Sequence, residues 1–325
     1  MSRAVLFLGF WVIINKMMNN KYLLGIVLTL FISAVIIGLR YQKKDYPTSP
    51  DNRIQITASF YPLFFFAQQI GGEKINAVNI TPAGAEPHDY ELTAQDIIQI
   101  ENSQLLIING GGLEIWAENI QKNIDPQKTI TLVAGKNLTS QTILENGEKI
   151  VDPHIWLNPL LANLIVDKIT QSLVQIDPAN KSYYEFNADN LQKRLMNLDE
   201  QYKKGLLNCE QRDFITAHTS FGYLAAAYNL NQVSITGLSP DSEPSPQQLA
   251  QVADFARKNN IKYIFFESLV SPKLSQTIAQ EIGAQTLMLN PIEGLGKKEI
   301  SQGKDYFTEM ESNLSNLKIA LQCKN

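Results

Sequence analysis

A long segment without a helix breaker divides the chain into two halves. After Asp177 and Pro178, a pair typical of a helix start, residues 179–204 contain neither proline nor glycine. Continued to Leu206, this helix would be roughly 43 Å long at ~1.5 Å per residue. Because a helix of that length can span a whole two-lobed protein, we expect it to connect one lobe to the other.

Short apolar runs alternate with helical patterns on both sides of this helix. Before it, the strand-like runs include IQITAS and LLIING, and helical patterns cover residues 61–70 and 94–102. After it, the strand-like runs are DFITA, QVSI, IKYIFFE and QTLMLN, and helical patterns cover 220–229, 246–259, 272–282 and 302–322. Strands that alternate with helices build parallel sheets. The sequence therefore predicts an α/β fold of two βα lobes with parallel-type sheets, joined by one long rigid α-helix.

The pattern also predicts domain boundaries. We assign residues 54–177 to an N-terminal lobe, 178–208 to the linking helix and 209–325 to a C-terminal lobe. A chain of 325 residues is long enough for two lobes that each bury a core.

The first 53 residues have a different character. Residues 22–39 are 18 uncharged, mostly apolar residues, which as a helix would span roughly 27 Å at ~1.5 Å per residue, enough to cross a bilayer. Because no small-x-small cleavage site is clear, we predict an uncleaved transmembrane signal anchor there, between a cytoplasmic signal n-region at 1–21 and a tether at 40–53. A start at Met17 or Met18 would instead give a conventional signal. Basic residues flank the span on both sides, so they do not orient it.

The charge balance and the missing motifs exclude several functions. Acidic residues outnumber basic ones after residue 53, so we expect no nucleic-acid partner. The sequence has no HExxH or GxSxG motif, and the glycine run at 109–113 lacks the spacing of a phosphate-binding loop.

Cys209 and Cys323 are the only cysteines. They are too far apart in sequence for a CxxC-type metal or redox motif. Outside the cytoplasm they could form a disulfide, worth up to ~4.7 kcal/mol for a long loop in the chain-entropy model. Two buried free thiols are the alternative.

Two of the three histidines in the chain follow an acid–proline pair. His88 lies in EPHDYE and His154 in DPHIW, each shortly before an expected helix. His218 follows the expected strand DFITA and precedes the helix that begins near Ser220. Ligands of open α/β sheets bind at the carboxyl ends of the strands, so all three histidines have a position that is typical of a binding site.

Three imidazoles on separate loops favour a metal site, because imidazole is the commonest side-chain ligand for zinc and related metals. We expect a fourth, carboxylate ligand near the end of a late strand. Glu293 in LNPIEGL is our prediction, and Glu267 in IFFESL is either the alternative or a partner that orients a ligand histidine. Such a set suits zinc better than manganese, and four protein ligands leave no position for a catalytic water. The predicted metal ligands are therefore His88, His154, His218 and Glu293, with no catalytic residue.

Several longer stretches carry a family resemblance. They are EPHDYELTAQDI, NGGGLEIW, DPHIWLNP, DPANKSYYEFNADNLQKRLMNLDEQYK, TAHTSFGYLAAAYNL, SPDSEPSPQQLAQV, IFFES and LNPIEGL. In this order, over nearly all of residues 54–325, they resemble the extracytoplasmic solute-binding proteins of bacterial zinc and manganese ABC transporters, the cluster A-I metal-binding family.

The resemblance implies a metal site in the cleft between the lobes. His88 and His154 match the two ligands of the N-terminal lobe, His218 the third ligand and Glu293 the acidic fourth. Manganese-type relatives carry a glutamate at the third position, so His218 indicates Zn²⁺, with Mn²⁺ as the alternative.

The resemblance also implies the function. We expect a monomeric, high-affinity extracytoplasmic receptor, not an enzyme, that delivers Zn²⁺ to an ABC-type importer, with the permease and its ATPase as partners. A manganese receptor, a metal-dependent surface adhesin and, less favoured, a zinc hydrolase are the alternatives. Some relatives have a cysteine pair in the C-terminal lobe, which supports a bridge between Cys209 and Cys323.

The chain departs from this family in two respects. Residues 135–151 lack the histidine-rich loop of many zinc-type relatives, and no cysteine occurs before residue 209 to accept a lipid. We therefore expect the N-terminal segment itself to hold the protein at the cytoplasmic membrane, facing the periplasm or the cell surface.

Overall fold

A computed structural model describes residues 53–325, except Asn146, Asp241 and Asn325. The predicted n-region, the predicted anchor at 22–39 and nearly all of the predicted tether lie outside the described residues. Arg53–Asn325 form one compact unit. In this described part, no helix combines the length and the apolar character needed to cross a membrane.

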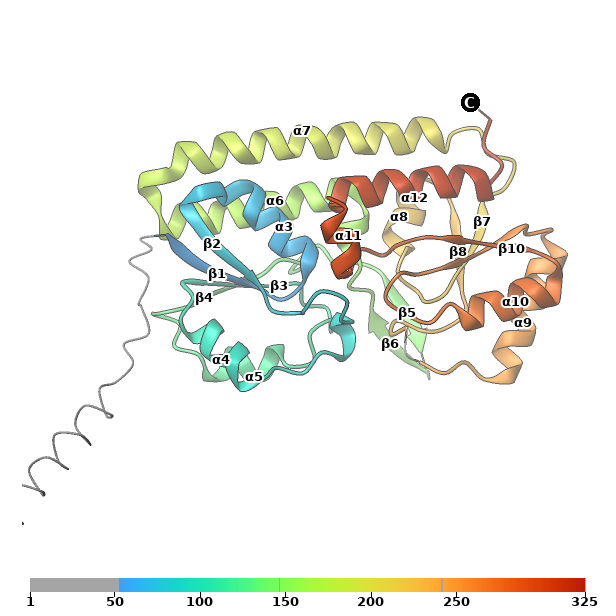
Figure 1. Cartoon of the computed structure of the whole chain (residues 1–325), viewed down its shortest axis with the longest axis horizontal. Helices are drawn as coiled ribbons and strands as arrows, with labels where there is room; N and C mark the ends of the chain where they lie inside the picture. The colour runs from blue at the N-terminus through green and yellow to red at the C-terminus, as the bar shows by residue number, and fades with distance from the viewer. Residues whose placement is uncertain (1–52, 146, 241, 325) are drawn as a thin grey trace, which may run out of the picture. The chain divides into compact units, whose positions relative to one another are not determined.

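The first sheet has four parallel strands in the order β2-β1-β3-β4 (Figure 1). Leu105 and Ile107 of β3 pack in the central core, whereas Leu106 and Ile108 pack in a second cluster with two helices on the opposite face. An apolar strand buried on both faces is typical of a parallel sheet. The elements are β1 (Ile54–Ala58), α3 (Tyr61–Gly71), β2 (Ile75–Asn79), α4 (Ala94–Glu101), β3 (Leu105–Ile108), α5 (Ala117–Asn123) and β4 (Ile130–Val133).

The second sheet repeats this arrangement, with four parallel strands in the order β10-β9-β7-β8. Phe214 and Phe265 face the central core, whereas Ile215 and Ile264 pack in a separate cluster with α9 and α10. The predicted α/β class with two parallel sheets is confirmed. The elements are β7 (Asp213–Thr216), α8 (Gly222–Ala227), β8 (Asn231–Ser234), α9 (Pro246–Lys258), β9 (Tyr263–Phe266), α10 (Lys273–Ile282) and β10 (Gln285–Met288).

A layer of long helices lies over both sheets (Figure 1). It consists of α6 (Pro159–Ile176), α7 (Lys181–Gly205) and α12 (Tyr306–Ala320), with α3 beneath α7. The side chain of Asn158 caps the first turn of α6, as the Asn–Pro pair predicts. The hydroxyl of Tyr202 in α7 donates to the carbonyl of Met310 in α12 at 2.6 Å. The central core under this layer takes residues from both sheets, so the two lobes share one apolar core.

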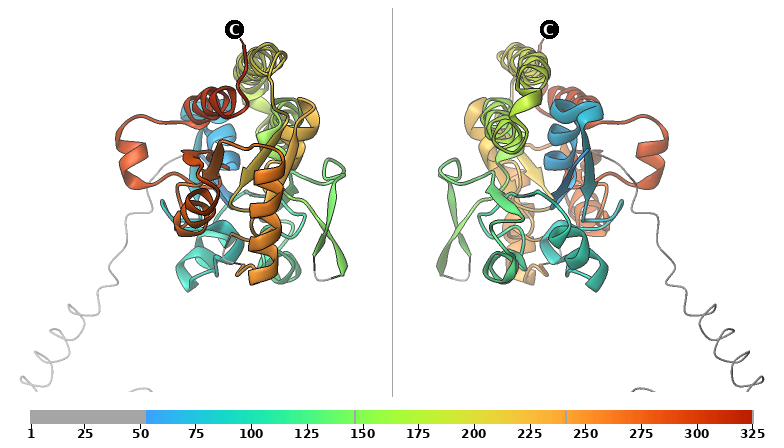
Figure 2. Two further views of the ribbon diagram at one scale, coloured as in Figure 1. Left: turned by 90° about the vertical axis from the view of Figure 1, so that its right-hand side faces the viewer. Right: turned by 90° about the vertical axis from the view of Figure 1, so that its left-hand side faces the viewer.

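Three features were not predicted. The segment 135–151 contains an antiparallel hairpin of β5 (Thr142–Glu145) and β6 (Glu148–Val151), which stands out from the side of the sheets in Figure 2. The Asn146–Gly147 pair between its strands is a turn signal from which a hairpin could have been expected. A short helix, α11 (Lys297–Ser301), precedes α12, and the linking helix begins only after the 3₁₀ turn η4 (Pro178–Asn180).

Cys209 and Cys323 form a disulfide. It joins the segment that follows α7 to the segment that follows α12, across a sequence separation of 114 residues. The bridged alternative is therefore confirmed over the two free thiols.

Candidate metal centre

The three histidines and Glu293 meet at one point between the lobes. Nε2 of His154 lies 3.2 Å from Nε2 of His88, 3.4 Å from Nε2 of His218 and 3.0 Å from Oε1 of Glu293. The same Oε1 lies 3.4 Å from Nε2 of His88 and 3.3 Å from Nε2 of His218. Ligand atoms around a tetrahedral zinc ion, each about 2.0–2.1 Å from the metal, are about 3.3–3.4 Å apart. Five of the six distances among the four atoms are therefore close to those of a tetrahedral site, and all four atoms lie within 4.8 Å of one another.

Three of these residues lie in loops that follow strands of the parallel sheets. His88 is in the 3₁₀ turn η2 (Pro87–Asp89), in the connection that follows β2. His218 comes directly after β7, and Glu293 is in the loop after β10. The carboxyl ends of strands from both lobes thus supply the site, as the sequence predicted.

His154 is held differently from the prediction. It follows β6 of the hairpin, not a strand of a parallel sheet. Asn109, directly after β3, donates its Nδ2 to the carbonyl of Pro153 at 2.9 Å and so attaches this loop to the end of the sheet. The buried carboxylate of Glu114 in turn accepts the backbone N–H of Asn109 and the hydroxyl of Ser59, both at 2.6 Å.

Two buried carboxylates orient two of the imidazoles. Asp152 accepts hydrogen bonds from the backbone N–H of His154 at 2.9 Å and from its Nδ1 at 2.8 Å. Glu267 accepts hydrogen bonds from the backbone N–H of His218 at 3.1 Å and from its Nδ1 at 2.7 Å. A proton on Nδ1 leaves the lone pair on Nε2, which faces the other ligand atoms. Glu267 thus lies where an orienting partner would lie, and Glu293 lies in the cluster.

Asp152 has no predicted role above, although the repeated acid–proline–histidine phrase contained the signal. In both acid–proline–histidine phrases the acid accepts the backbone N–H of the histidine two residues later, at 3.3 Å for Glu86 with His88 and 2.9 Å for Asp152 with His154. The carboxyl group of Glu86 also interacts electrostatically with residues of the cluster, among them Glu293. Burial, followed by the charge of Glu293, raises the pKa of Glu86 to about 9.

Burial and mutual charge decide how the centre is protonated. The side chains of His154, His218 and Glu293 are 0% exposed, and that of His88 is 8% exposed. Burial lowers the pKa of His88. Burial also disfavours a charged His218, but the carboxylates of Glu267 and Glu293 outweigh it and raise the pKa of His218 well above its usual value.

The same balance applies to the other two groups of the cluster. Burial opposes the charged form of His154, but its hydrogen bonds to Asp152 and Glu293 raise its pKa. Burial would raise the pKa of Glu293, yet the charge of His218 and the hydrogen bonds from the imidazoles hold it well below its usual range. The second oxygen of Glu293 is buried and has no hydrogen-bond partner among the described residues. Without a metal, protonated imidazoles thus balance the negative charge of the Glu293 carboxylate. A bound cation could supply this positive charge instead.

A cavity of about 260 Å³ reaches His88 from the surface. Residues of both lobes line it, among them Asp89, Gly111, Pro153, Leu238 and Ser239. The hydroxyl of Ser239 donates to the carboxylate of Asp89 at 3.4 Å, which connects the two lobes beside this cavity. His88 therefore lies on the side of the cluster from which an ion could enter.

Known zinc-uptake proteins are similar to this protein over most of its chain. A family model described as zinc-uptake complex component A, periplasmic (ZnuA) matches residues 56–320. The high-affinity zinc uptake system protein ZnuA of Bacillus subtilis (strain 168) is 37% identical over 296 residues, which cover 87% of this chain and 92% of that protein. The zinc-binding lipoprotein AdcA of Streptococcus pneumoniae is 35% identical over 282 residues; this match spans 82% of the chain but only 56% of AdcA.

Solved structures share the fold. The Zn(II)-bound ZnuA-like domain of Streptococcus pneumoniae AdcA superposes with a TM-score of 0.73 at 36% identity, covering 83% of this chain and 99% of that domain. The laminin-binding protein Lmb of Streptococcus agalactiae, described as bifunctional with adhesin and metal-transporting activity, superposes with a TM-score of 0.75 at 31% identity, covering 83% and 99%. With a family match over most of its length and relatives above 30% identity, this chain belongs to the ZnuA family of zinc-uptake components, a family of solute-binding receptors.

Proposed function

We propose that this protein is an extracytoplasmic receptor that binds Zn²⁺ between its lobes and delivers it to the permease and ATPase of an ABC importer. The ligands are His88, His154, His218 and Glu293. The observation that carries the proposal is the convergence of their four buried ligand atoms, five of whose six mutual distances are close to those around a tetrahedral zinc ion. The names of the related zinc-uptake proteins support the same function.

Binding fits this site better than catalysis does. The cluster offers four ligand atoms from the protein, whereas a catalytic zinc keeps one position for water or substrate. Glu267, the carboxylate that would serve as a base in a hydrolase, is engaged with the backbone N–H and Nδ1 of His218. A receptor needs only to hold and release the ion.

The ligand set favours zinc over manganese. Three of the four ligand atoms are imidazole nitrogens, and manganese prefers sites richer in oxygen. A manganese receptor of the same family is the alternative that the test below separates.

The test is metal analysis of the purified full-length chain, followed by competition between Zn²⁺ and Mn²⁺. We expect one zinc ion per chain that excess Mn²⁺ does not displace. Alanine at His88, His154 and His218 together should abolish binding, because these are all the histidines of the chain. Asp199→Asn is the control. Asp199 is a buried acid near the C-terminal end of α7, where it contacts Tyr228 and Lys203. Zinc bound one-to-one by the triple variant would refute the proposal.

We also propose that residues 22–39 anchor a monomeric receptor at the outer face of the cytoplasmic membrane. The support is their 18 uncharged, mostly apolar residues and the periplasmic description of the family. The full chain should sediment with membranes, and a chain that begins at Arg53 should remain in the soluble fraction as a monomer. Equal sedimentation of both chains would contradict the anchor.

Surface adhesion is a second candidate function, favoured by the likeness to Lmb. Deletion of the gene distinguishes the two functions. Loss of growth in zinc-limited medium, with attachment to laminin unchanged, supports uptake alone. Loss of attachment with normal growth supports adhesion instead.

A further inference from the structure

The hydroxyl of Tyr223, on α8 of the C-terminal lobe, reaches the base of the β5–β6 hairpin, where the chain enters at Ser140 and Gln141 and leaves at Asp152. We call these three residues the foot of the hairpin. It accepts the backbone N–H groups of Ser140 and Gln141 at 2.9 and 3.0 Å and donates to the carbonyl of Asp152 at 3.1 Å. Ser140 and Gln141 precede β5, and Asp152 follows β6. A single hydroxyl, with its hydrogen-bonding capacity filled, therefore holds both ends of the hairpin.

Gly222, the preceding residue, allows this close approach. A Cβ atom at this position would lie 2.7 Å from Oδ2 of Asp152 and 2.8 Å from Oε1 of Gln141, closer than side-chain atoms can pack. The Gly222 carbonyl also accepts a hydrogen bond from Nε2 of Gln141 at 3.4 Å. Glycine at 222 thus lets the start of α8 lie directly against the carboxylate of Asp152.

This contact connects metal ligands of both lobes. Asp152 is the carboxylate that binds the backbone N–H and Nδ1 of His154. Tyr223 lies five residues after His218, in the first turn of α8. The same part of the C-terminal lobe therefore carries one ligand and holds the residue that orients a ligand of the other lobe.

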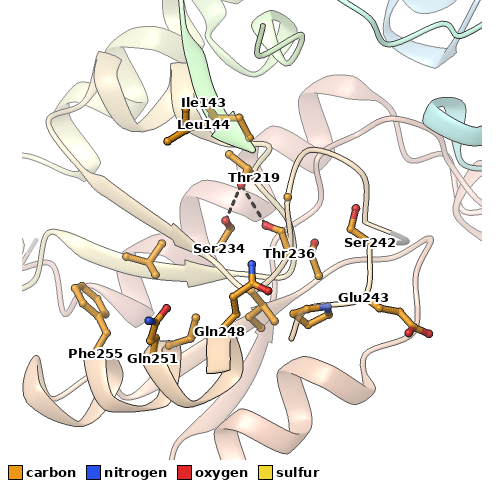
Figure 3. Close-up of a pocket in the computed structure, with 15 residues that line it drawn as sticks. Ile143, Leu144, Thr219, Ser234, Thr236, Ser242, Glu243, Gln248, Gln251 and Phe255 are labelled. Carbon is orange, nitrogen blue, oxygen red and sulfur yellow. Dashed lines mark hydrogen bonds between the residues drawn. The ribbon is translucent and has the colours of Figure 1, made fainter. Parts of the chain in front are cut away.

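Beyond its foot, the hairpin borders a cavity instead of packing closely on the C-terminal lobe. Ile143 and Leu144 line one side of this cavity of about 600 Å³ (Figure 3). The other side includes Thr219, Ser234, Thr236, Gln248 and Phe255. Within the described part of the chain, every hydrogen bond between residues 140–152 and the C-terminal lobe runs to Gly222 or Tyr223. The foot is therefore the place where hydrogen bonds hold the hairpin to that lobe.

We propose that Tyr223 is a positioning residue for the bound ion. Its hydroxyl fixes the hairpin foot and Asp152, so that the imidazole of His154 stays aligned on the metal, and the absence of a side chain at Gly222 permits the contact. The inference rests on the proposed zinc-binding function. Because the contact holds a ligand that is already in place, its loss affects release of the ion more than capture.

The decisive variant is Tyr223→Phe in the full chain. It keeps the ring but leaves two N–H donors and one carbonyl without their partner. When the zinc-loaded protein is mixed with excess chelator, we expect zinc release about tenfold faster than in the parent. The absorption spectrum of the Co²⁺-substituted protein should change, because the cobalt bands report ligand geometry. Hydrogen exchange at the Ser140 and Gln141 amides should accelerate, also without metal.

Tyr228→Phe is the matched control. Tyr228 directly follows α8 and is buried, and its hydroxyl donates to Asp199 on α7 at 3.1 Å. Its loss should lower stability without changing zinc release or the cobalt spectrum. Gly222→Ala should accelerate release with the Tyr223 hydroxyl still present, because the added Cβ must displace either the carboxylate of Asp152 or the start of α8.

Two results would overturn the proposal. One is unchanged zinc release and an unchanged cobalt spectrum in Tyr223→Phe although the two amides exchange faster. The other is unchanged exchange at both amides, which would mean that the hydroxyl does not hold them. The metal content of the parent protein separates this failure from failure of the proposed function. A parent protein that retains no zinc would contradict the proposed function itself.

Discussion

Each histidine of the centre has its own electrostatic environment, although all three face one point. His88, beside the surface cavity, has a pKa lowered by burial, so it is neutral and ready to bind a cation. His218, held between Glu267 and Glu293, has a pKa raised well above its usual value. A cation that enters past His88 must therefore displace a proton from the inner part of the cluster.

The displaced proton leads to a pH prediction. Zinc binds only neutral imidazole, so a raised pKa of His218 means that zinc competes with a proton up to a higher pH. Affinity should rise with pH until the pH exceeds that pKa, and should fall as the pH drops below it. Because the pKa of His154 is raised as well, we expect between one and two protons released per zinc ion near neutral pH. Calorimetry in buffers of different ionisation enthalpy measures this number, and a binding heat independent of the buffer would contradict the prediction.

Glu267 should affect both the affinity and the proton. Glu267→Gln keeps an acceptor for Nδ1 of His218 but removes the negative charge that raises the pKa of this histidine. We expect zinc binding weaker by about 10–100-fold, as for other residues that orient a ligand, and fewer protons released. Competition with a chelator of known affinity measures the first effect. Asp199→Asn, a buried acid away from the cluster, should change neither quantity.

The four residues of the cluster could be selected from the sequence, but the acids that hydrogen-bond to the histidines could not all be paired with them. Only three histidines exist, and each lies near the end of an expected strand, so position alone selected them. The pairing of His218 with Glu267 spans 49 residues. It depends on β9 lying beside β7 in the sheet order β10-β9-β7-β8, and a single sequence does not specify the order of parallel strands.

At the level of secondary structure, long elements were easier to predict than short ones. The linking helix was visible because 25 residues of α7 carry a helical pattern with no internal proline. The hairpin was not predicted because each of its strands has only four residues. Apolar side chains such as Leu144, which is 73% exposed, do not alternate with polar ones as in a half-buried strand. Yet the foot of this hairpin positions His154.

The disulfide should stabilise the helical layer without acting on the centre. It closes a loop of 114 residues at the ends of α7 and α12. Replacing Cys209 and Cys323 by serine should lower the free energy of unfolding by about 4–5 kcal/mol in the chain-entropy model. Denaturant titration measures this loss, with the reduced parent protein as the control. Zinc affinity should stay unchanged, and a matching loss of affinity would show that the bridge also orders the site.

Across the whole molecule, buried hydrogen bonds connect the lobes beside the centre. Nε1 of Trp156 donates to the carbonyl of Pro291 at 2.7 Å, and the hydroxyl of Tyr306 donates to the carbonyl of Trp156 at 2.6 Å. Trp156 lies two residues after His154, and Pro291 two residues before Glu293. The ligand loops of the two lobes are thus tied to each other directly.

These ties and the shared core predict that the two lobes unfold together. The central core takes Leu105 and Ile107 from one sheet and Phe214 and Phe265 from the other. Neither lobe can then lose its structure without exposing apolar surface of its neighbour, so calorimetry should show one transition. Zinc bound at the proposed site would bridge the same two lobes and should raise the transition temperature, with a gain of about 4.1 kcal/mol when free zinc exceeds the dissociation constant 1,000-fold. The triple histidine variant should show the single transition without the zinc-dependent gain. Two separate transitions, or a gain confined to one of them, would mean that the lobes behave as independent units and that the ion is held by one of them alone.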